Sequence, residues 1–394
     1  MRSTSCKEIA HEILDRCLAG KPPKELPRAL VEAPCGQALF GVLVEGLADR
    51  FEPALCDAYA RLFSQALSYV QDACEPASLV ARYERVRRTR PVSGKPRKIF
   101  VLSRVTLGAD VAVTSVLLAA AKKRFPHASI VFVGPRKNYE LFAADPRIHH
   151  AEAGYRRGGL RQRLAVWEVL KALLAEPDSL VIDPDSRLTQ LGLLPVCPED
   201  RYHLFESRAY GNASNRPLPE LAAAWAEETL GVAGAKPYVA LGRLPRRGPY
   251  VAVSFGVGEN PAKRIPDPFE RDLLALLAEG GMPLSVDTGA GGEEAERVRR
   301  AVKESGAPAT LWEGSFAGFA SIIAGSRLYV GYDSAGQHVA AACGVPLVGV
   351  FAGFPAPRMF DRWRPTGERS TVIRVDRPDP AAVLERVRAA IEPR

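Results

Sequence analysis

The chain has 394 residues, of which 47% are hydrophobic and 25% are charged, and it contains 33 Gly and 32 Pro. Because this length exceeds that of an ordinary domain, we expect more than one hydrophobic core. The formal net charge is +8. Together these values exclude an acidic disordered chain, a collagen-like repeat and a small disulfide scaffold.

The basic residues are concentrated in one place. Residues 82–98, RYERVRRTRPVSGKPRK, hold eight basic residues and one acid, which is a net charge of +7 out of the +8. The rest of the chain is therefore nearly neutral. The excess of basic residues describes a connector rather than the whole protein.

The sequence predicts a cytoplasmic protein. No apolar run approaches the roughly 18 residues of a spanning helix, and the first residues, MRSTSCKEIAHEIL, do not resemble a signal peptide. The seven cysteines include no CxxC pair. We expect buried, reduced thiols rather than zinc ligands.

Residues 1–90 read as a helical domain. Apolar side chains repeat at helical spacing from Ile9 to Leu18 and again from Leu43 to Val70, with no strand-like run between them. A basic linker at 91–97 follows, marked by two Pro and one Gly.

From residue 98 onwards, short apolar runs alternate with helical patterns. The predicted strands of the first unit, 98–241, are KIFVLSRV, SIVFVG and DSLVID. The second unit, 242–377, begins with the linker GRLPRRGP at 242–249, and its strands are YVAVSFG, MPLSVDTG, ATLWEG, RLYVGYD and VPLVGVF. A last helix occupies 378–394. The alternation predicts an α/β protein with two doubly wound parallel sheets and a ligand cleft between their carboxyl ends.

The stretch DSAGQHVAAACGVP at 333–346 carries the strongest chemical signal. A predicted strand ends just before Asp333, and small residues then open a helix. Such a helix start offers free N–H groups to a diphosphate, and His338 lies one turn further on. Asp333 as a simple N-cap and His338 as a core histidine are equally compatible with this local pattern.

This stretch resembles the nucleotide-sugar signature of glycosyltransferase family 9, the ADP-heptose:lipopolysaccharide heptosyltransferases, D-[ST]-G-x-x-H-x-x-A-A-x-G-x-P. One position departs, because Ala335 stands where the family has Gly, with Gly336 directly after it. The resemblance covers roughly residues 98–357. It implies a GT-B fold, two Rossmann-like domains with the helical domain added in front, and a nucleotide-sugar site that includes Asp333, Ser334, Ala335, Gly336 and His338.

Two further elements resemble the donor side of that family. FGVGENPAKRIP resembles the element ending in K-x-W-P and implies that Lys263 binds the diphosphate, although Ile265 replaces the usual Trp. SVDTGAGGEEAERV implies a ribose-binding role for Glu293, although this residue and Glu294 also suit the first turn of a helix.

Two elements resemble the acceptor side. VLSRVTLGAD resembles the S-x-x-G-D element and implies that Asp110 is the catalytic base, with Ala109 as an apparent extra residue after Gly108. Asp110 as a helix cap remains the alternative. SLVIDPDSRL implies an acceptor-side role for Asp183; we discount Asp183-Pro184-Asp185 as a metal-binding DxD motif, and no metal or cofactor is expected.

The predicted function is inverting, metal-independent transfer of a sugar, heptose by resemblance, from a nucleoside diphosphate to a hydroxyl of a glycan, a lipid-linked or a protein acceptor. A degenerate GT-B docking module and a sugar-nucleotide epimerase are the alternatives. The connector at 82–98 is a solvated linker, a contact for anionic lipid at the inner face of the membrane, or a nucleic-acid contact; we expect no nucleic acid, because the stretch holds a single aromatic residue and no binding module.

Overall fold

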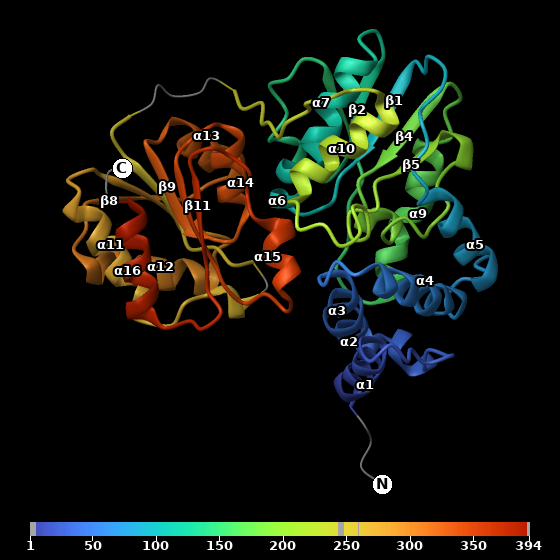
Figure 1. Cartoon of the computed structure of the whole chain (residues 1–394), viewed down its shortest axis with the longest axis horizontal. Helices are drawn as coiled ribbons and strands as arrows, with labels where there is room; N and C mark the ends of the chain where they lie inside the picture. Colours follow the sequence, from blue (N-terminus) through green and yellow to red (C-terminus); the bar gives the residue numbers. More distant parts are fainter. Residues whose placement is uncertain (1–4, 243–247, 259, 392–394) are drawn as a thin grey trace.

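The computed structural model describes residues 5–242, 248–258 and 260–391. Two parallel sheets flanked by helices lie side by side, and the N-terminal helices extend from one of them (Figure 1). Most of the linker predicted at 242–249 lies outside the described residues. Within them, no helix is both long and apolar enough to cross a membrane.

The N-terminal sheet has five parallel strands in the order β3-β2-β1-β4-β5. The strands are β1 (Lys98–Leu102), β2 (Ser129–Gly134), β3 (Ile148–Glu152), β4 (Ser179–Asp183) and β5 (Tyr202–Leu204). The helices of this unit are α6 (Leu107–Ala109), α7 (Ser115–Arg124), α8 (Arg136–Tyr139), α9 (Leu160–Leu173) and α10 (Leu218–Leu230). Short helical turns lie at Asp110–Thr114 (η4, a π turn), Arg187–Thr189 and Glu199–Arg201.

The C-terminal sheet has six parallel strands in the order β11-β10-β9-β6-β7-β8. They are β6 (Val251–Ser254), β7 (Leu284–Asp287), β8 (Ala309–Trp312), β9 (Leu328–Tyr332), β10 (Leu347–Phe351) and β11 (Ser370–Arg374). Its helices are α11 (Phe269–Glu279), α12 (Gly292–Ser305), α13 (Phe316–Gly325), α14 (Ala335–Ala342), α15 (Pro357–Trp363) and α16 (Pro380–Ile391), with a short turn at Pro261–Lys263.

Both faces of the N-terminal sheet are buried, which is why its central strands are nearly all apolar. Along β1, Phe100 and Leu102 face one core and Ile99 and Val101 face another, as the alternation of side chains in a strand requires. The second core continues without a break into α13 and α14 of the C-terminal unit. The two sheets therefore meet through their facing helices.

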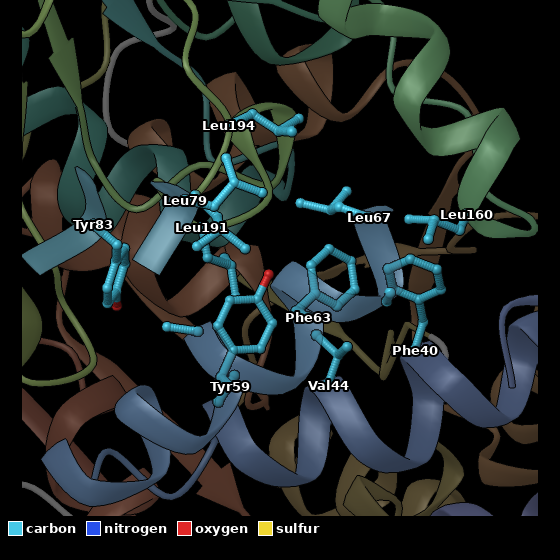
Figure 2. Packing of buried hydrophobic residues seen from close by; sticks show 14 of the residues in the cluster. Phe40, Val44, Tyr59, Phe63, Leu67, Leu79, Tyr83, Leu160, Leu191 and Leu194 are labelled. Atoms are coloured by element: carbon cyan, nitrogen blue, oxygen red, sulfur yellow. The ribbon is translucent and has the colours of Figure 1, made fainter. Parts of the chain in front are cut away.

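The N-terminal helices share a core with the sheet rather than forming a separate one. They are α1 (Cys6–Leu18), α2 (Gly36–Ala38), α3 (Glu45–Ala48), α4 (Pro53–Ser68) and α5 (Pro76–Val86), with short turns at Arg28–Val31, Ala33–Cys35 and Leu39–Val44. Their side chains Phe40, Tyr59 and Phe63 pack with Leu160 and Leu191 of the sheet unit (Figure 2). The boundary predicted near residue 90 therefore does not separate two cores.

Internal contacts engage much of the basic connector. Arg82 is buried and lies over the Tyr202 ring at 4.8 Å. Arg87 bonds Glu206 at 2.9 Å and Arg85 bonds Glu199 at 2.7 Å. These residues hold the N-terminal helices against the sheet unit. The contact with anionic lipid stays a prediction. Fewer cations of the connector are available for such a contact than its sequence suggests.

The expectation that all cysteines are reduced is wrong for two of them. Cys6 at the start of α1 forms a disulfide with Cys35. Cys17, Cys56, Cys74, Cys197 and Cys343 take no part in a disulfide. The pair went unnoticed because the two cysteines are 29 residues apart and no motif links them.

Helix α15 connects the two units. Arg362 is completely buried and donates to the backbone oxygens of Tyr210 and Asn212, at 3.2 and 3.0 Å. Arg358 donates to the backbone oxygen of Phe51 at 2.9 Å. This helix thus fixes the wall of the cleft described next.

Candidate active site

A cavity of about 370 Å³ lies between the two units, where loops from the carboxyl ends of both sheets converge. The N-terminal unit contributes Val105, Thr106, Leu107, Gly108, Ala109, Lys137 and Arg157 to its lining. The C-terminal unit contributes Val257, Gly258, Lys263, Asp333, Ser334, Ala335, His338, Met359 and Trp363. This cavity is called the cleft below.

On the C-terminal side, the structure brings the predicted residues together. Strand β9 ends at Tyr332 and α14 begins at Ala335, so Asp333 and Ser334 form the turn between them. Lys263 Nζ lies 2.6 Å from Asp333 Oδ2, and the side chain of Gln337 donates to Asp333 Oδ1. Asp333 therefore positions Lys263 rather than capping the helix. The start of α14 and the Lys263 ammonium, which is paired with Asp333, together offer N–H donors to an anion.

The departure from the family signature at Ala335 has a local explanation. The Tyr329 ring lies beneath α14, and a β carbon on Gly336 would come within 2.2 Å of the tyrosine oxygen. A β carbon on Gly331 would approach the same oxygen to 2.6 Å. Glycine is therefore needed at position 336, whereas Ala335 lines the cleft without such a clash.

His338 lies at the junction of the two units. Its ring packs edge-to-face on Trp363, with centroids 6.2 Å apart. A β carbon on Gly108 would lie 3.2 Å from His338 Cδ2 and also 3.2 Å from Ala335 Cα. Burial first, and then the Lys263 charge, lowers the pKa of His338 to about 4, so its imidazole is neutral at pH 7.

The ribose carboxylate predicted at Glu293 is exposed in the first turn of α12. It does not line the cleft. Its neighbour Glu294 is half-buried, accepts from the backbone N–H of Ala290 at 3.4 Å, and lies against the backbone of Gly256 after β6. Burial raises the pKa of Glu294. The role of Glu293 stays a prediction, and Glu294 occupies the more enclosed position.

Asp110 lies outside the cleft. It is completely buried and accepts four hydrogen bonds, from Ser103 Oγ, Thr114 Oγ1 and Asn138 Nδ2 at 2.6 Å each and from the Arg104 N–H at 2.7 Å. Burial raises the pKa of its carboxyl group, against those hydrogen bonds. This is the geometry of a carboxylate that ties loops together, and it argues against the predicted role as base.

The extra residue at Ala109 accounts for the position of Asp110. Residues Asp110–Thr114 form a π turn, a form of helix that accommodates one additional residue. Ala109 lines the cleft, whereas Asp110 is buried in the interior of the N-terminal unit. The same turn brings Gly108 against α14.

The aspartates after β4 are also engaged internally. Asp183 is buried and accepts from Ser186 N–H at 2.6 Å, from Thr189 and from Tyr202. Asp185 is buried against Arg208, with Oδ2 and Nε 2.9 Å apart. Neither residue lines the cleft. Across residues 5–242, 248–258 and 260–391, no group of three or more His, Cys, Asp or Glu side chains is arranged to hold a metal ion.

Sequence reasoning missed the aromatic and basic lining of the cleft. Trp363 from α15 contacts the guanidinium group of Arg104, which is 5.6 Å from its ring centroid. Arg104 is held by Ser207 Oγ at 2.8 Å and by the backbone oxygen of Pro184. Lys137 enters from the start of α8. Arg157 belongs to a basic stretch at 156–163, and no sequence pattern distinguishes it as the residue of that stretch that lines the cleft.

Comparisons with known proteins agree with this architecture. Residues 201–388 match the family model "Glycosyltransferase family 9 (heptosyltransferase)". No match is found among curated protein sequences. Similar solved structures include a family 9 glycosyl transferase from Veillonella parvula, with a TM-score of 0.55, 16% identity, and coverage of 72% of this chain and 87% of the other.

Two structures from E. coli are similar to the same degree. Heptosyltransferase WaaC with ADP has a TM-score of 0.54 at 18% identity, covering 74% of this chain and 99% of its own. ADP-heptose lps heptosyltransferase II has a TM-score of 0.52 at 20% identity, covering 74% and 98%. The similarity to these structures shows that the chain has a GT-B fold, and residues 201–388 are similar to the glycosyltransferase family 9 model.

Proposed function

We propose that this protein transfers heptose from ADP-heptose to an acceptor hydroxyl, with inversion at the anomeric carbon and without a metal ion. The single observation that carries the proposal is the corner formed by Lys263, Asp333 and the start of α14. A diphosphate placed there meets the Lys263 ammonium and the free N–H groups of the helix. Solved structures of similar fold hold ADP or an ADP-heptose analogue, which favours adenine as the base.

The residues proposed for donor binding are those predicted from sequence. Lys263 and the backbone at Ser334, Ala335 and Gly336 hold the diphosphate, and His338 donates to one of its oxygens. Positive charge at this point also assists the reaction, because the bond that breaks leaves its electron pair on the nucleoside diphosphate. Glu293 is proposed for the ribose hydroxyls, with Glu294 as the competing carboxylate.

The acceptor enters from the N-terminal unit. Lys137 and Arg157 line that side of the cleft, so an acceptor that carries negative charge suits it. A glycan, a lipid-linked or a protein acceptor each remains in the proposal. We also propose a cytoplasmic location, where nucleotide sugars are used, with peripheral contact to anionic lipid through the unengaged residues of the connector.

One observation favours a second candidate function. Asp110 is withdrawn from the cleft, as expected of a docking module that binds a nucleotide without turning it over. Incubation with ADP-heptose, with ADP release measured and ADP binding followed by calorimetry, separates the two. Binding with steady release supports the transferase, binding without release supports the docking module, and absence of binding removes both.

A further inference from the structure

Among the residues of the cleft that the structure describes, no free carboxylate is present to accept a proton as the family signature implies. The apparent extra residue Ala109 lines the cleft, and Asp110, to which the resemblance gives the role of base, is buried behind it with four donors. Within the described lining, only Asp333 and His338 carry side chains able to accept a proton at neutral pH. The other charged lining residues, Lys137, Arg157 and Lys263, are cationic types.

Asp333 is poorly suited to accept a proton. One of its carboxylate oxygens is 2.6 Å from Lys263 Nζ, and the other accepts from the Gln337 amide. Protonation of this carboxylate would break its ion pair with Lys263. That pair sits where the positive charge is needed for the leaving group.

His338 has the required position and freedom. It packs between Trp363 and Gly108, and Gly108 belongs to the loop on the acceptor side of the cleft. Among the described residues, no hydrogen bond reaches either ring nitrogen. A neutral imidazole has one N–H donor and one acceptor nitrogen, so a single ring can donate to a phosphate oxygen and face an incoming hydroxyl.

We propose that His338 is the group that removes the proton from the attacking hydroxyl. The inference rests on the proposed function and replaces Asp110 as the base. The acceptor oxygen forms a bond to the anomeric carbon as its proton passes to the free imidazole nitrogen. The bond from that carbon to the phosphate oxygen breaks, and its electron pair leaves with the nucleoside diphosphate.

The charges around His338 fit this role. Lys263 lowers its pKa and Asp333 raises it, while Lys137 and Arg157 share the cleft. These neighbours and burial keep the ring neutral before substrate enters. The negative charge of a bound diphosphate then favours the imidazolium that forms when the proton arrives.

His338→Gln tests the proposal, because the amide retains a donor for phosphate but is not a base. With ADP-heptose as donor and water as acceptor, we expect ADP release to fall about 100-fold or more. ADP affinity, measured by calorimetry, should change less than about fivefold. The matched control is His127→Gln on the exposed surface, which should leave both values unchanged.

A second substitution adds a carboxylate to the described lining of the cleft. Ala109→Asp in the His338→Gln background should recover ADP release at least about tenfold, because it places a carboxylate beside Gly108. His338→Asn repeats the test if the Gln variant does not fold.

The outcomes distinguish the inference from the proposed function. Unchanged release in His338→Gln overturns the inference alone. Wild-type protein that binds ADP without releasing it from ADP-heptose overturns the inference and the transferase together. A parallel loss of ADP binding and release in His338→Gln also contradicts the inference, since it assigns His338 to donor binding only.

Discussion

Substituting Asn for Asp110 separates a structural carboxylate from a catalytic one. The four donors divide evenly between its two oxygens, with Ser103 Oγ and Asn138 Nδ2 on Oδ2. In the Asn variant an N–H₂ group replaces one of the two carboxylate oxygens. The two buried donors that bonded this oxygen then face another donor and lose their acceptor. Each buried donor without an acceptor costs about 1–3 kcal/mol. For Ser103 the cost lies at the low end of this range, because its hydroxyl can rotate.

We therefore expect Asp110→Asn to lower the free energy of unfolding by about 2–4 kcal/mol. At about 2 °C or more per kcal/mol for a unit of this size, the melting temperature falls by at least about 4 °C. Differential scanning calorimetry measures this change. The exposed Asp200→Asn serves as the control, with an expected change close to zero.

The same variant is then assayed well below its melting temperature. If Asp110 only ties the loops together, ADP release from ADP-heptose stays within about tenfold of wild type, a loss that displaced loops explain. A stable variant whose release falls about 1,000-fold with unchanged ADP affinity would contradict a purely structural role for Asp110. Asp110 would then be the base, reached through a rearrangement of the π turn.

Three further predictions concern the donor side and the response to acid. Lys263→Ala should weaken ADP binding about 10- to 100-fold in calorimetry, while a comparable loss for adenosine would contradict a phosphate contact. Gly336→Ala should lower the melting temperature, because its β carbon would lie 2.2 Å from the Tyr329 oxygen. Adding Tyr329→Leu to this variant should restore part of the lost melting temperature. An unchanged melting temperature in the single variant would show that the helix shifts freely. His338 and His203 both have a pKa lowered to about 4, mainly by burial, so the unfolded chain binds protons that the folded chain does not between pH 6.5 and 4. The contribution of these neutral histidines to the free energy of unfolding is fully present above pH 6.5 and falls toward pH 4 by about 3 kcal/mol for each histidine. The free energy of unfolding of His203→Gln, measured with urea, should therefore depend less on pH than that of the wild type. Parallel curves for the two proteins would contradict this prediction.

Sequence reasoning identified the central strands and the edge strand β8, and it missed the edge strands β3, β5 and β11. β1, β2 and β4 are short apolar runs because helices cover both of their faces. β3 reads IHHAE and is partly exposed, β5 has three residues, and β11 is largely half-buried. β3 and β11 bury less surface than the central strands, and β5 is buried but only three residues long, so composition does not distinguish these three strands from loops.

The candidate site was predicted best where its residues are consecutive. Asp333 to His338 form one turn and the start of one helix, so the chain itself holds them together. The direction in which Asp110 points depends on how one extra residue is absorbed, and the π turn that absorbs it has no clear sequence signature. Trp363 comes from α15 at the end of the chain, and only the packing of the two units brings it to the cleft.

The sequence showed how much positive charge the connector carries, but it did not show which acids pair with that charge. The connector at 82–98 was correctly seen as basic. Arg85 pairs with Glu199 and Arg87 pairs with Glu206, and both acids lie more than 100 residues further along the chain. Long-range ion pairs of this kind leave no local sequence pattern. They hold part of the connector against the N-terminal sheet unit, so that this part is not available as a surface patch.

The central claim is that Lys263 and the start of α14 bind the diphosphate of an adenine nucleotide sugar. Isothermal titration calorimetry of the wild-type protein with ADP, and with UDP, GDP and TDP for comparison, tests it most directly. We expect saturable binding of ADP that is tighter than binding of the other three diphosphates. Tighter binding of another diphosphate would contradict the assignment of adenine, and absence of binding by all four would contradict the site itself.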